Sequence, residues 1–430
     1  MRKIRIGLIG FGTVGSGVVK ILKKKRLFLK RKSGIEIILK RVCDIDFRRR
    51  RGISLNRSII TKDYRDVIKD PDIDIVIELV GGIHPAKEII MGALSNGKDV
   101  VTANKALLAE EGSSIFELAA RAKREVYFEA SVGAGIPIIK SIRESLIANK
   151  FNTIYGIVNG TSNFILSKMS SDYCTFAEAL REARRRGFAE KRPRLDIEGI
   201  DSAHKLLLLV RLAFGKILKL NNIFVEGIRS IELSDVKYAA EMNLEIKLLA
   251  IAKKIKDELE VRVHPTLISK EHMLASVDGI FNAIYVDTDT AGELLFYGQG
   301  AGSVPSSSSV VSDIMDLAKR RLGAGQNQVI FLKDNSIKRL RKMDEIFSRY
   351  YIRFMAIDRP GVLSRISACL GKHNISIASV SQKERKRARV VPIVMITHEA
   401  KERSMHNALE EIYRLAVIRE RPVAIRMEEL

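Results

Sequence analysis

The chain has 430 residues, of which 46% are apolar and 29% are charged, a balance that is ordinary for a globular protein. No apolar run approaches the length of about 20 residues that a membrane span needs. The formal net charge of +23 is spread along the chain, and its basic clusters are not interleaved with aromatic residues. This pattern favours solvated faces over nucleic-acid binding. The densest basic clusters are Lys23–Arg26, Arg48–Arg51, Arg184–Arg186 and Lys383–Arg389.

The three cysteines, Cys43, Cys174 and Cys369, are far apart and show neither a disulfide pattern nor metal-ligand spacing. The first residues already form an apolar strand pattern, so we expect no signal peptide before the fold. Both observations predict a protein of the reducing cytoplasm.

The first part of the chain alternates short apolar runs with helical patterns. The predicted elements are strand 4–9, helix 14–29, strand 35–42, strand 73–79, helix 85–95, strand 99–102 and helix 113–123. Such alternation implies crossover units in a parallel sheet. We therefore predict a doubly wound sheet of the Rossmann type over residues 1–132.

Residues 133–305 have a less regular pattern, which predicts a mixed α/β substrate domain with an open sheet. Its predicted elements are helix 136–148, strand 151–158, helix 176–186, helix 203–214 and strands 228–232, 259–264 and 283–287. The Gly- and Ser-rich stretch 291–309 is expected to be a loop. Residues 306–343 are predicted to form a helix, 310–320, that packs back against the first domain, followed by a linker, 326–342.

Residues 344–430 show a strand–helix–strand–strand–helix order. The predicted elements are strand 350–356, helix 362–373, strand 375–382, strand 390–397 and helix 400–413. This order within a short segment predicts a ferredoxin-like fold.

A glycine-rich turn follows the first strand and opens the first helix. It reads Gly10-Phe11-Gly12-Thr13-Val14-Gly15. Glycines at this spacing allow a tight turn and close approach of a pyrophosphate, which then lies at the helix N-terminus. In this strand–turn–helix context the motif predicts binding of a dinucleotide.

Charged residues after the second strand bear on the choice between NAD and NADP. Asp44 or Asp46 is placed to accept hydrogen bonds from the ribose hydroxyls of NAD. Arg48–Arg51 come next, where the 2′-phosphate of NADP would lie, and guanidinium groups suit phosphate well. Within this run, Arg48 and Arg49 are the candidate cofactor-binding residues. The arginines favour NADP, with a solvated basic turn as the alternative.

Polar residues at the end of the strand 99–102 point to the ligand-binding edge of the sheet. Thr102 ends the strand, and Lys105 follows it. Ligands bind at the carboxyl ends of strands in this architecture, so Lys105 is placed to contact the substrate or the nicotinamide. Position alone does not separate this role from that of an exposed lysine.

The segment from Glu190 to Lys205 holds the densest group of candidate catalytic residues. Asp201 and Lys205 are four residues apart and share one helix face. A carboxylate beside a lysine can orient its ammonium, which can then exchange a proton with a substrate oxygen. Glu190 and Asp196 are placed to bind a substrate ammonium. The alternative is an exposed, salt-bridged start of a helix.

Several motifs together resemble the homoserine dehydrogenase family over roughly residues 3–325. They are Glu129-Ala-Ser-Val-Gly-Ala-Gly-Ile-Pro137, Asn159-Gly-Thr-Ser-Asn-Phe-Ile165, Leu195-Asp-Ile-Glu-Gly-Ile-Asp-Ser-Ala-His-Lys205 and Gly298-Gln-Gly-Ala-Gly302. Their order and spacing make the resemblance specific. The tail from about residue 348 resembles an ACT domain, a module that senses small molecules, through Asp358-Arg-Pro-Gly-Val-Leu363 and Ile375-Ser-Ile-Ala-Ser-Val-Ser-Gln382.

The resemblance implies interconversion of L-aspartate 4-semialdehyde and L-homoserine with NAD(P)H, in the biosynthesis of threonine, methionine and isoleucine. Lys205 would be the proton donor and acceptor, positioned by Asp201, and Lys105 would lie near the cofactor and the substrate. Glu190 and Asp196 would bind the substrate, and Gly302 would close over the cofactor.

The same resemblance implies a monovalent cation, Na⁺, around Glu129, Val132, Ala134 and Ile136, since oxygen ligands suit a hard cation. It also implies a homodimer or higher homo-oligomer and an amino-acid effector at the ACT-like tail.

One departure from the family lies beside the predicted substrate site. The family has a small residue, an acid and a proline after the glutamate, whereas this chain has Glu190-Lys191-Arg192-Pro193. We expect these cations to affect substrate affinity more than the type of reaction.

Two kinds of alternative function remain open from the sequence. One is a different NAD(P)-dependent aldehyde reductase. A phosphorylating aldehyde dehydrogenase would need a cysteine nucleophile, for which Cys174 is the only mid-domain candidate. The other is an amino-acid-sensing regulator that binds nucleic acid, which the absence of a recognition-helix motif disfavours.

Overall fold

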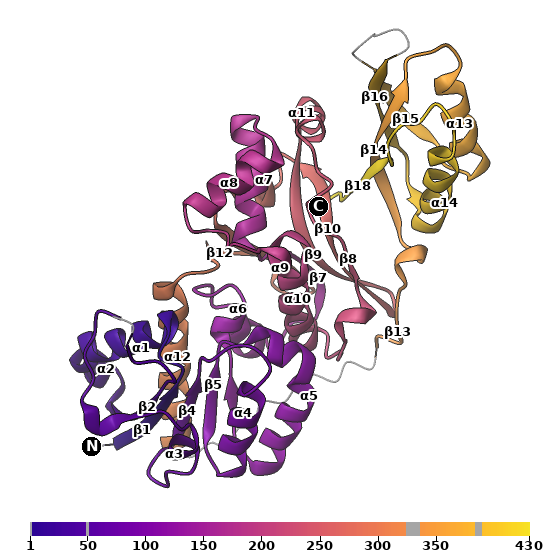
Figure 1. Cartoon of the computed structure of the whole chain (residues 1–430). Coiled ribbons are helices and arrows are strands. Elements are labelled where there is room, and N and C mark those ends of the chain that lie inside the picture. Colours follow the sequence, from indigo (N-terminus) through magenta and orange to yellow (C-terminus); the bar gives the residue numbers. More distant parts are fainter. Residues whose placement is uncertain (1, 49–50, 324–335, 383–388) are drawn as a thin grey trace.

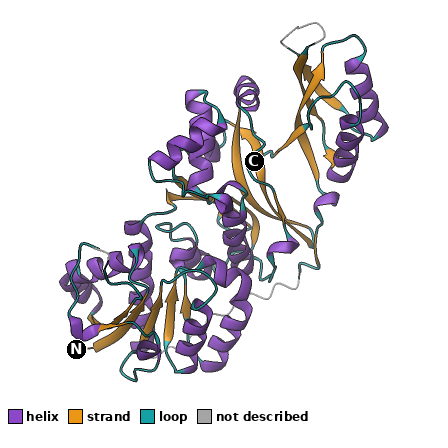
Figure 2. Cartoon of the chain, in the orientation of Figure 1, coloured by secondary structure: helices purple, strands orange, loops and turns teal. Residues whose placement is uncertain are grey.

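The computed structural model describes residues 2–48, 51–323, 336–382 and 389–430. Arg49, most of the basic cluster 383–389 and the first part of the predicted linker therefore lie outside the described residues. The chain forms a six-stranded sheet and a 12-stranded sheet, seen as two groups of orange strands in Figure 2. The N-terminal part and the yellow C-terminal part lie at opposite ends of the molecule (Figure 1). No helix among the described residues is long and apolar enough to span a membrane.

The six-stranded sheet has the order β3-β2-β1-β4-β5-β6, and all of its strands run parallel. Its strands are β1 (Arg2–Ile9), β2 (Ile35–Cys43), β3 (Ile60–Thr61), β4 (Ile75–Glu78), β5 (Asp99–Thr102) and β6 (Val126–Tyr127). Its helices are α1 (Thr13–Lys24), α2 (Arg26–Ser33), α3 (Arg65–Ile68), α4 (Ala86–Ser95) and α5 (Lys105–Ala122). Helix α1 covers one face and α4 and α5 cover the other, which confirms the predicted doubly wound architecture.

Two helices in this domain differ from the prediction. The predicted helix 14–29 is broken at Lys25, after which α2 begins with a new axis. Helix α1 buries Val18 and Val19 against the sheet, whereas α2 has no buried residue. Packing against the core therefore does not keep α2 as a continuation of α1. Helix α5 begins eight residues earlier than predicted, because the Asn104 side chain caps it by accepting from the backbone N–H of Leu107 at 3.2 Å.

The 12-stranded sheet has the order β12-β11-β7-β9-β10-β18-β14-β16-β15, and β8, β13 and β17 pair off this path. Its substrate-domain strands are β7 (Phe151–Ile157), β8 (Phe224–Val225), β9 (Leu244–Ile255), β10 (Glu258–Ser269), β11 (Phe281–Thr288), β12 (Gly292–Gln299) and β13 (Arg339–Leu340). The accompanying helices are α6 (Ile138–Lys140), α7 (Gly160–Asp172), α8 (Phe176–Arg185), α9 (Arg194–Ile197), α10 (Ile200–Ala213) and α11 (Leu233–Glu241). Helices α7, α10 and α11 all pack against β9, as predicted for a mixed α/β domain.

Three local predictions in this domain are wrong. Residues 228–232 form a turn instead of a strand, because the Ile228 N–H bonds the carbonyl of Ile197 at 2.9 Å. The predicted helix 136–148 is limited to α6 and a wide helical turn over Ser141–Ser145. The Gly-rich stretch predicted as a loop contains strand β12, since pairing with β11 along its whole length overrides its weak intrinsic preference.

The C-terminal unit has the predicted ferredoxin-like order and two further strands, the short β17 and the C-terminal β18. Its elements are β14 (Phe347–Ile357), α13 (Val362–Lys372), β15 (Ile377–Ser381), β16 (Val390–Thr397), β17 (Ala400–Lys401), α14 (Glu402–Tyr413) and β18 (Val423–Met427). Strand β18 pairs with β14 on one side and with the end of β10 on the other. The sheet of the C-terminal unit is therefore continuous with the sheet of the substrate domain.

Helix α12 (Ser303–Leu322) returns the chain to the first domain and starts earlier than the predicted residue 310. It packs along α1, where Ser303 and Ser307 donate to the carbonyls of Thr13 and Val14 at 3.0 and 2.9 Å. Gly17 is required at this contact, because a Cβ there would lie 2.2 Å from the Ser307 hydroxyl. The start of α12 is thus fixed beside the glycine-rich turn.

Candidate active site

The glycine-rich turn between β1 and α1 has the local geometry that a pyrophosphate needs. Gly10 has a φ of +97°, and a Cβ there would lie 2.5 Å from the backbone of Leu79. A Cβ on Gly15 would lie 2.1 Å from the carbonyl oxygen of Gly10, so this glycine allows the helix to pack against the strand end. A Cβ on Gly12 would meet nothing within 4 Å, so the space beside this residue is open to a ligand.

Asp44, which follows the end of β2, stabilises this turn with its carboxylate. Its carboxylate accepts the backbone N–H of Phe11 at 2.7 Å and that of Asp46 at 2.8 Å. The Arg51 guanidinium lies 3.5 Å from the same carboxylate and 5.3 Å from the centre of the Phe11 ring. Arg51 therefore lies closer to the turn than the exposed Arg48, although sequence reasoning singled out Arg48 and Arg49. The signal for Arg51 is the aromatic residue within the glycine motif.

A cavity of about 510 Å³ lies where the two domains meet. It collects residues from the glycine turn, the end of β5, the loop after β6, the start of α7, the α9–α10 segment and the loop before α12. Of the residues predicted as functional, those that line it are Val14, Lys105, Ala134, Asp196, Asp201, Lys205 and Gly302. Residues more than 280 positions apart in the sequence thus face one space.

Lys205 and Asp201 form a buried ion pair at this cavity. The Lys205 ammonium donates to Asp201 Oδ2 at 2.7 Å and to the carbonyl of Val158 at 2.5 Å. The ammonium of Lys105 lies 3.1 Å from Asp201 Oδ1. One carboxylate therefore orients two ammonium groups, as the i, i+4 spacing on α10 suggested for one of them.

Asn159 joins this ion pair to Asp196. Its side-chain N–H₂ donates to Asp196 Oδ1 at 2.7 Å and to Asp201 Oδ2 at 2.8 Å. Its side-chain oxygen accepts the backbone N–H of Ser162 at 2.8 Å and so caps α7. From the sequence, this loop was one of the motifs that carry the family resemblance, but Asn159 was given no role in the site, and the Asn-Gly pair at a strand–helix junction was the one local signal.

Burial and the interactions among four charged groups, those of Lys105, Asp196, Asp201 and Lys205, set the protonation equilibria of this cluster. Burial lowers the pKa of Lys205, and Asp201 offsets only part of that shift. Burial alone would raise the pKa of the Asp201 carboxyl, but the ammonium groups of Lys205 and Lys105 hold it well below its usual range. Burial raises the pKa of Asp196, although the bond from Asn159 opposes this change. The cluster therefore pairs a fixed carboxylate with an ammonium that releases its proton more readily than usual.

Several predicted site residues are not among those that line this cavity, and two of them are Glu190 and Thr102. Glu190 is exposed in the turn before α9 and is not among the lining residues. Thr102 is buried, and its hydroxyl donates to Glu78 at 2.6 Å and accepts from the backbone N–H of Asn104 at 3.0 Å. Thr102 thereby fixes the turn that presents Lys105.

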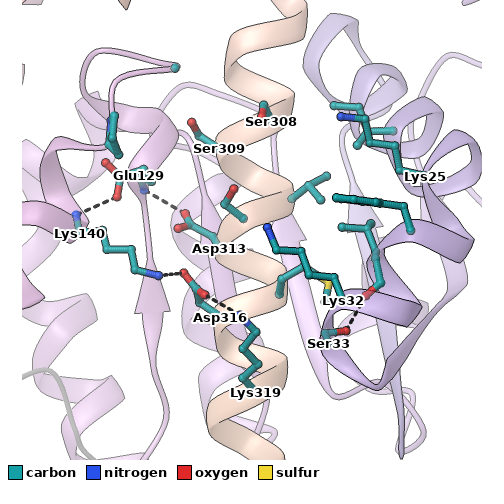
Figure 3. Close-up of a pocket in the computed structure, with 18 residues that line it drawn as sticks. Lys25, Lys32, Ser33, Glu129, Lys140, Ser308, Ser309, Asp313, Asp316 and Lys319 are labelled. Carbon is teal, nitrogen blue, oxygen red and sulfur yellow. Dashed lines mark hydrogen bonds and ion pairs between the residues drawn. The ribbon is translucent and has the colours of Figure 1, made fainter. Parts of the chain in front are cut away.

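The segment 129–137 separates this cavity from a second one of about 430 Å³. Ala130, Ser131, Gly133 and Ala134 line the first cavity. Figure 3 shows the second cavity, with Glu129 on one side of α12 and Lys25 and Lys32 on the other.

Glu129 is buried at the start of this segment and held by backbone groups. Its carboxylate accepts the N–H of Ile139 at 2.9 Å and that of Lys140 at 2.8 Å, and its own N–H donates to Asp313 at 2.9 Å (Figure 3). Burial raises the pKa of Glu129 to about 7, against the effect of these two N–H groups. Burial also raises the pKa of Asp313 well above its usual range.

Comparison with protein families matches the three parts of the chain. Residues 10–129 match a model described as the NAD binding domain of homoserine dehydrogenase. Residues 137–315 match the model described as homoserine dehydrogenase, and residues 350–417 match the ACT domain. A protein named homoserine dehydrogenase from Neisseria gonorrhoeae is 42% identical over 434 residues, which cover all of both chains.

Solved structures agree with this assignment. The crystal structure of a homoserine dehydrogenase from Thiobacillus denitrificans has a TM-score of 0.92 and 40% identity, covering 100% of this chain and 99% of that one. A hyperthermophilic archaeal homoserine dehydrogenase in complex with NADPH has a TM-score of 0.63 and 28% identity, covering 73% of this chain and 97% of that one. Neither comparison supports a nucleic-acid-binding regulator. The chain belongs to the homoserine dehydrogenase family and is an NAD(P)-dependent oxidoreductase that acts on a CH–OH group.

Proposed function

We propose that Lys205 transfers the proton when this enzyme interconverts L-aspartate 4-semialdehyde and L-homoserine. The buried Lys205–Asp201 pair, open to a cavity beside the glycine turn, carries this proposal. When bound, the nicotinamide supplies or accepts the hydride at the carbonyl carbon. Lys205 gives its proton to the carbonyl oxygen during reduction and takes it back during oxidation, which requires hydrogen-bond contact with that oxygen.

The remaining members of the cluster position Lys205 and the substrate. Asp201 stabilises the charge of the Lys205 ammonium and orients it. Lys105 adds positive charge beside the substrate oxygen, which becomes negative during reduction. Asp196 binds the substrate ammonium, and Glu190 joins it when the exposed turn closes over the substrate. Lys191 and Arg192 lie in that turn and lower the affinity for the ammonium by repulsion. Oxidation of NADPH on addition of aspartate semialdehyde tests the reaction as a whole.

The charged residues that follow strand β2 support a preference for NADP over NAD. The Asp44 carboxylate is already engaged by the Phe11 N–H, so it is a poor acceptor for a ribose hydroxyl. Arg51 lies over Phe11 at the edge of the same turn, and Arg48 is exposed next to it. The archaeal relative solved with NADPH supports the same choice. Gly10 to Gly15 hold the pyrophosphate, and Gly302 closes over the cofactor from α12.

Replacing Arg51 with alanine is expected to raise the KM for NADPH by about tenfold and to leave the KM for NADH within about twofold. The reason is the loss of one guanidinium–phosphate interaction, which only NADPH can make. Initial rates at saturating semialdehyde measure both constants. Arg57→Ala is the control, because Arg57 is an exposed arginine six residues further along the chain. An equal rise in the KM for NADPH and for NADH would show that Arg51 supports the turn and does not bind the 2′-phosphate.

The backbone of segment 129–136 supports binding of a monovalent cation, Na⁺. Val132, Ala134 and Ile136 are buried, and Gly133 and Ala134 have left-handed backbone, so the chain turns tightly here. Carbonyl oxygens and the Glu129 residue form a donor set that suits a hard cation. The cation would fix the segment that lines the active-site cavity.

Sodium chloride is expected to raise the midpoint of thermal unfolding by a few degrees relative to choline chloride at equal ionic strength. A ligand that binds only the folded state stabilises it by mass action. Differential scanning calorimetry measures the two midpoints. Identical midpoints over the millimolar to molar range would contradict a sodium site.

Three further proposals concern partners and location. We place the enzyme in the cytoplasm, because its cysteines are unpaired and well separated. A homodimer or higher homo-oligomer is supported by the open edge of the large sheet, where β12 pairs only with β11 among the described strands. The ACT domain supports binding of a small amino-acid effector.

A further inference from the structure

The side chain of Asn282, on β11, is fully buried and makes no hydrogen bond. Its exposure is 0%, and neither Nδ2 nor Oδ1 has a partner in the part of the chain that the structure describes. Asn163, by contrast, donates from its Nδ2 to the carbonyls of Val277 and Gly279 at 2.9 and 3.1 Å. A buried carboxamide without partners is costly, because it has lost its bonds to water. Asn282 therefore holds an unused donor and an unused acceptor.

The backbone of Gly300 lies directly on this carboxamide. A Cβ added to Gly300 would lie 1.9 Å from Asn282 Cγ, 2.0 Å from Nδ2 and 2.4 Å from Oδ1. Any larger residue at Gly300 would therefore push the carboxamide away. Gly300 belongs to the short loop that joins β12 to α12, and so leads from the substrate domain to the first domain (Figure 1). The carboxamide thus supports this loop from the side of β11.

Hydrogen bonds hold the loop of residues 300–302 at both of its ends. Before the loop, the carbonyl of Gln299 accepts the N–H of Gly135 at 3.3 Å. After the loop, the Ser303 hydroxyl donates to the carbonyl of Thr13 at 3.0 Å. The first bond joins the loop to the segment that lines the active-site cavity, and the second joins it to the glycine-rich turn. The ends are therefore fixed against the two parts of the chain that surround the cofactor site.

The middle of the loop has backbone groups that match the carboxamide. Gly300, Ala301 and Gly302 line the active-site cavity, and the N–H groups of the first two make no hydrogen bond among the described residues. A ligand that fills the cavity removes water from these N–H groups, so they then need a protein partner. The peptide group between Gly300 and Ala301 offers one N–H and one carbonyl, and the Asn282 side chain offers the complementary acceptor and donor. A modest rotation of this peptide group brings the two into hydrogen-bond contact.

We propose that Asn282 is a positioning residue for the reaction and acts through the loop of residues 300–302. When the cofactor is bound, the Asn282 carboxamide bonds the peptide group between Gly300 and Ala301 and fixes the loop over the cavity. These bonds form only in the cofactor complex, so they strengthen cofactor binding and alignment and add nothing to the stability of the free enzyme. This inference rests on the proposed closing of Gly302 over the cofactor.

Asn282→Leu tests this role in the full chain, because leucine keeps the branched shape and forms no hydrogen bond. Without cofactor, the thermal unfolding midpoint of Asn282→Leu is expected not to fall, since no bond of the free enzyme is lost. The Kd for NADPH, followed by its fluorescence, is expected to rise by about tenfold. Asn163→Leu is the contrasting control, and its midpoint is expected to fall without cofactor, because the carbonyls of Val277 and Gly279 lose their donor. Asn282→Ala, which cannot clash with Gly300, is expected to show the same rise in Kd if leucine does not fit.

Hydrogen exchange and kinetics separate positioning from packing. NADPH is expected to slow exchange of the N–H groups of Gly300 and Ala301, followed by mass spectrometry, more in the native chain than in Asn282→Leu. At saturating NADPH and semialdehyde, the kcat of Asn282→Leu is expected to fall by at least about tenfold, because the loop stays misaligned.

Two results would overturn the role of Asn282 alone. One is a free Asn282→Leu enzyme as unstable as Asn163→Leu, which would show that the carboxamide is already bonded without cofactor. The other is native NADPH affinity, native exchange protection and native kcat in Asn282→Leu and Asn282→Ala. In both cases the native chain binds NADPH and turns over semialdehyde. A folded native chain that binds neither NADPH nor NADH would contradict the proposed function, and this inference with it.

Discussion

Replacing Lys205 with alanine is expected to lower the rate of semialdehyde reduction by about 10²–10⁴-fold, the usual contribution of one positioned acid–base group. The ammonium is held by Asp201 and by the carbonyl of Val158, and no other lysine of the cavity shares that position. Oxidation of NADPH at saturating semialdehyde measures the rate. Binding of NADPH, followed by its fluorescence, is expected to change by less than about twofold, because Lys205 lies on the substrate side.

The pH dependence separates a proton-transfer role from a structural one. Reduction needs the charged ammonium, so its kcat/KM is expected to fall as pH rises through the lowered pKa of Lys205. Oxidation of homoserine needs the neutral amine and is expected to rise over the same range. Lys98→Ala is a matched control, because Lys98 is also buried and also donates to backbone carbonyls, far from the cavity. A Lys205→Ala enzyme with near-native rates and an unchanged pH profile would exclude this residue as the proton donor.

Replacing Asp235 with alanine is expected to destabilise the junction of the substrate domain and the ACT domain by about 3–5 kcal/mol, because it leaves the buried Arg353 guanidinium with only the exposed Glu232 as a partner. Asp235 is 0% exposed and accepts from Arg353 at 2.7 Å and from Tyr351 at 2.9 Å across the seam between α11 and β14. Urea unfolding followed by far-ultraviolet circular dichroism measures the loss of stability.

Two further variants show whether the unpaired charge is the cause. The triple change Asp235→Leu, Arg353→Met and Tyr351→Phe removes all the polar partners together and is expected to recover most of the lost stability. Glu232→Ala removes an exposed partner of Arg353 and is expected to cost less than about 1 kcal/mol. Equal destabilisation by the single and triple changes would assign the effect to lost packing volume.

The parts of the site that lie close together in the sequence were predictable, and the parts joined across the fold were not. Helical spacing placed Asp201 beside Lys205, and the strand–turn–helix context identified the glycine turn. The bonds from Asn159 and to Val158 join residues more than 40 positions apart. Nothing in a local pattern indicates such a pairing, because it depends on how β7 ends against α10.

The same distinction holds for the fold. Alternating apolar runs predicted the parallel sheet, since each strand is buried on both faces by its own crossover helices. Strand β12 was missed because its glycines and exposed positions resemble a loop, and only pairing with β11 makes it a strand. Residues 228–232 show the reverse case: a β-branched run was predicted as a strand, but the Ile228 N–H is used by Ile197.

The position of β18 also constrains the order in which the chain can fold during synthesis. Strands β10 and β14 are made first. The end of β10 at Thr266 and Leu267 pairs with β9 on one edge, and its other edge has no partner until residues 423–427 leave the ribosome. The large sheet therefore remains divided, with two unpaired strand edges, until almost the whole chain exists. A chain stopped a few residues early would expose both edges, and its failure would be seen as aggregation rather than as loss of one small strand.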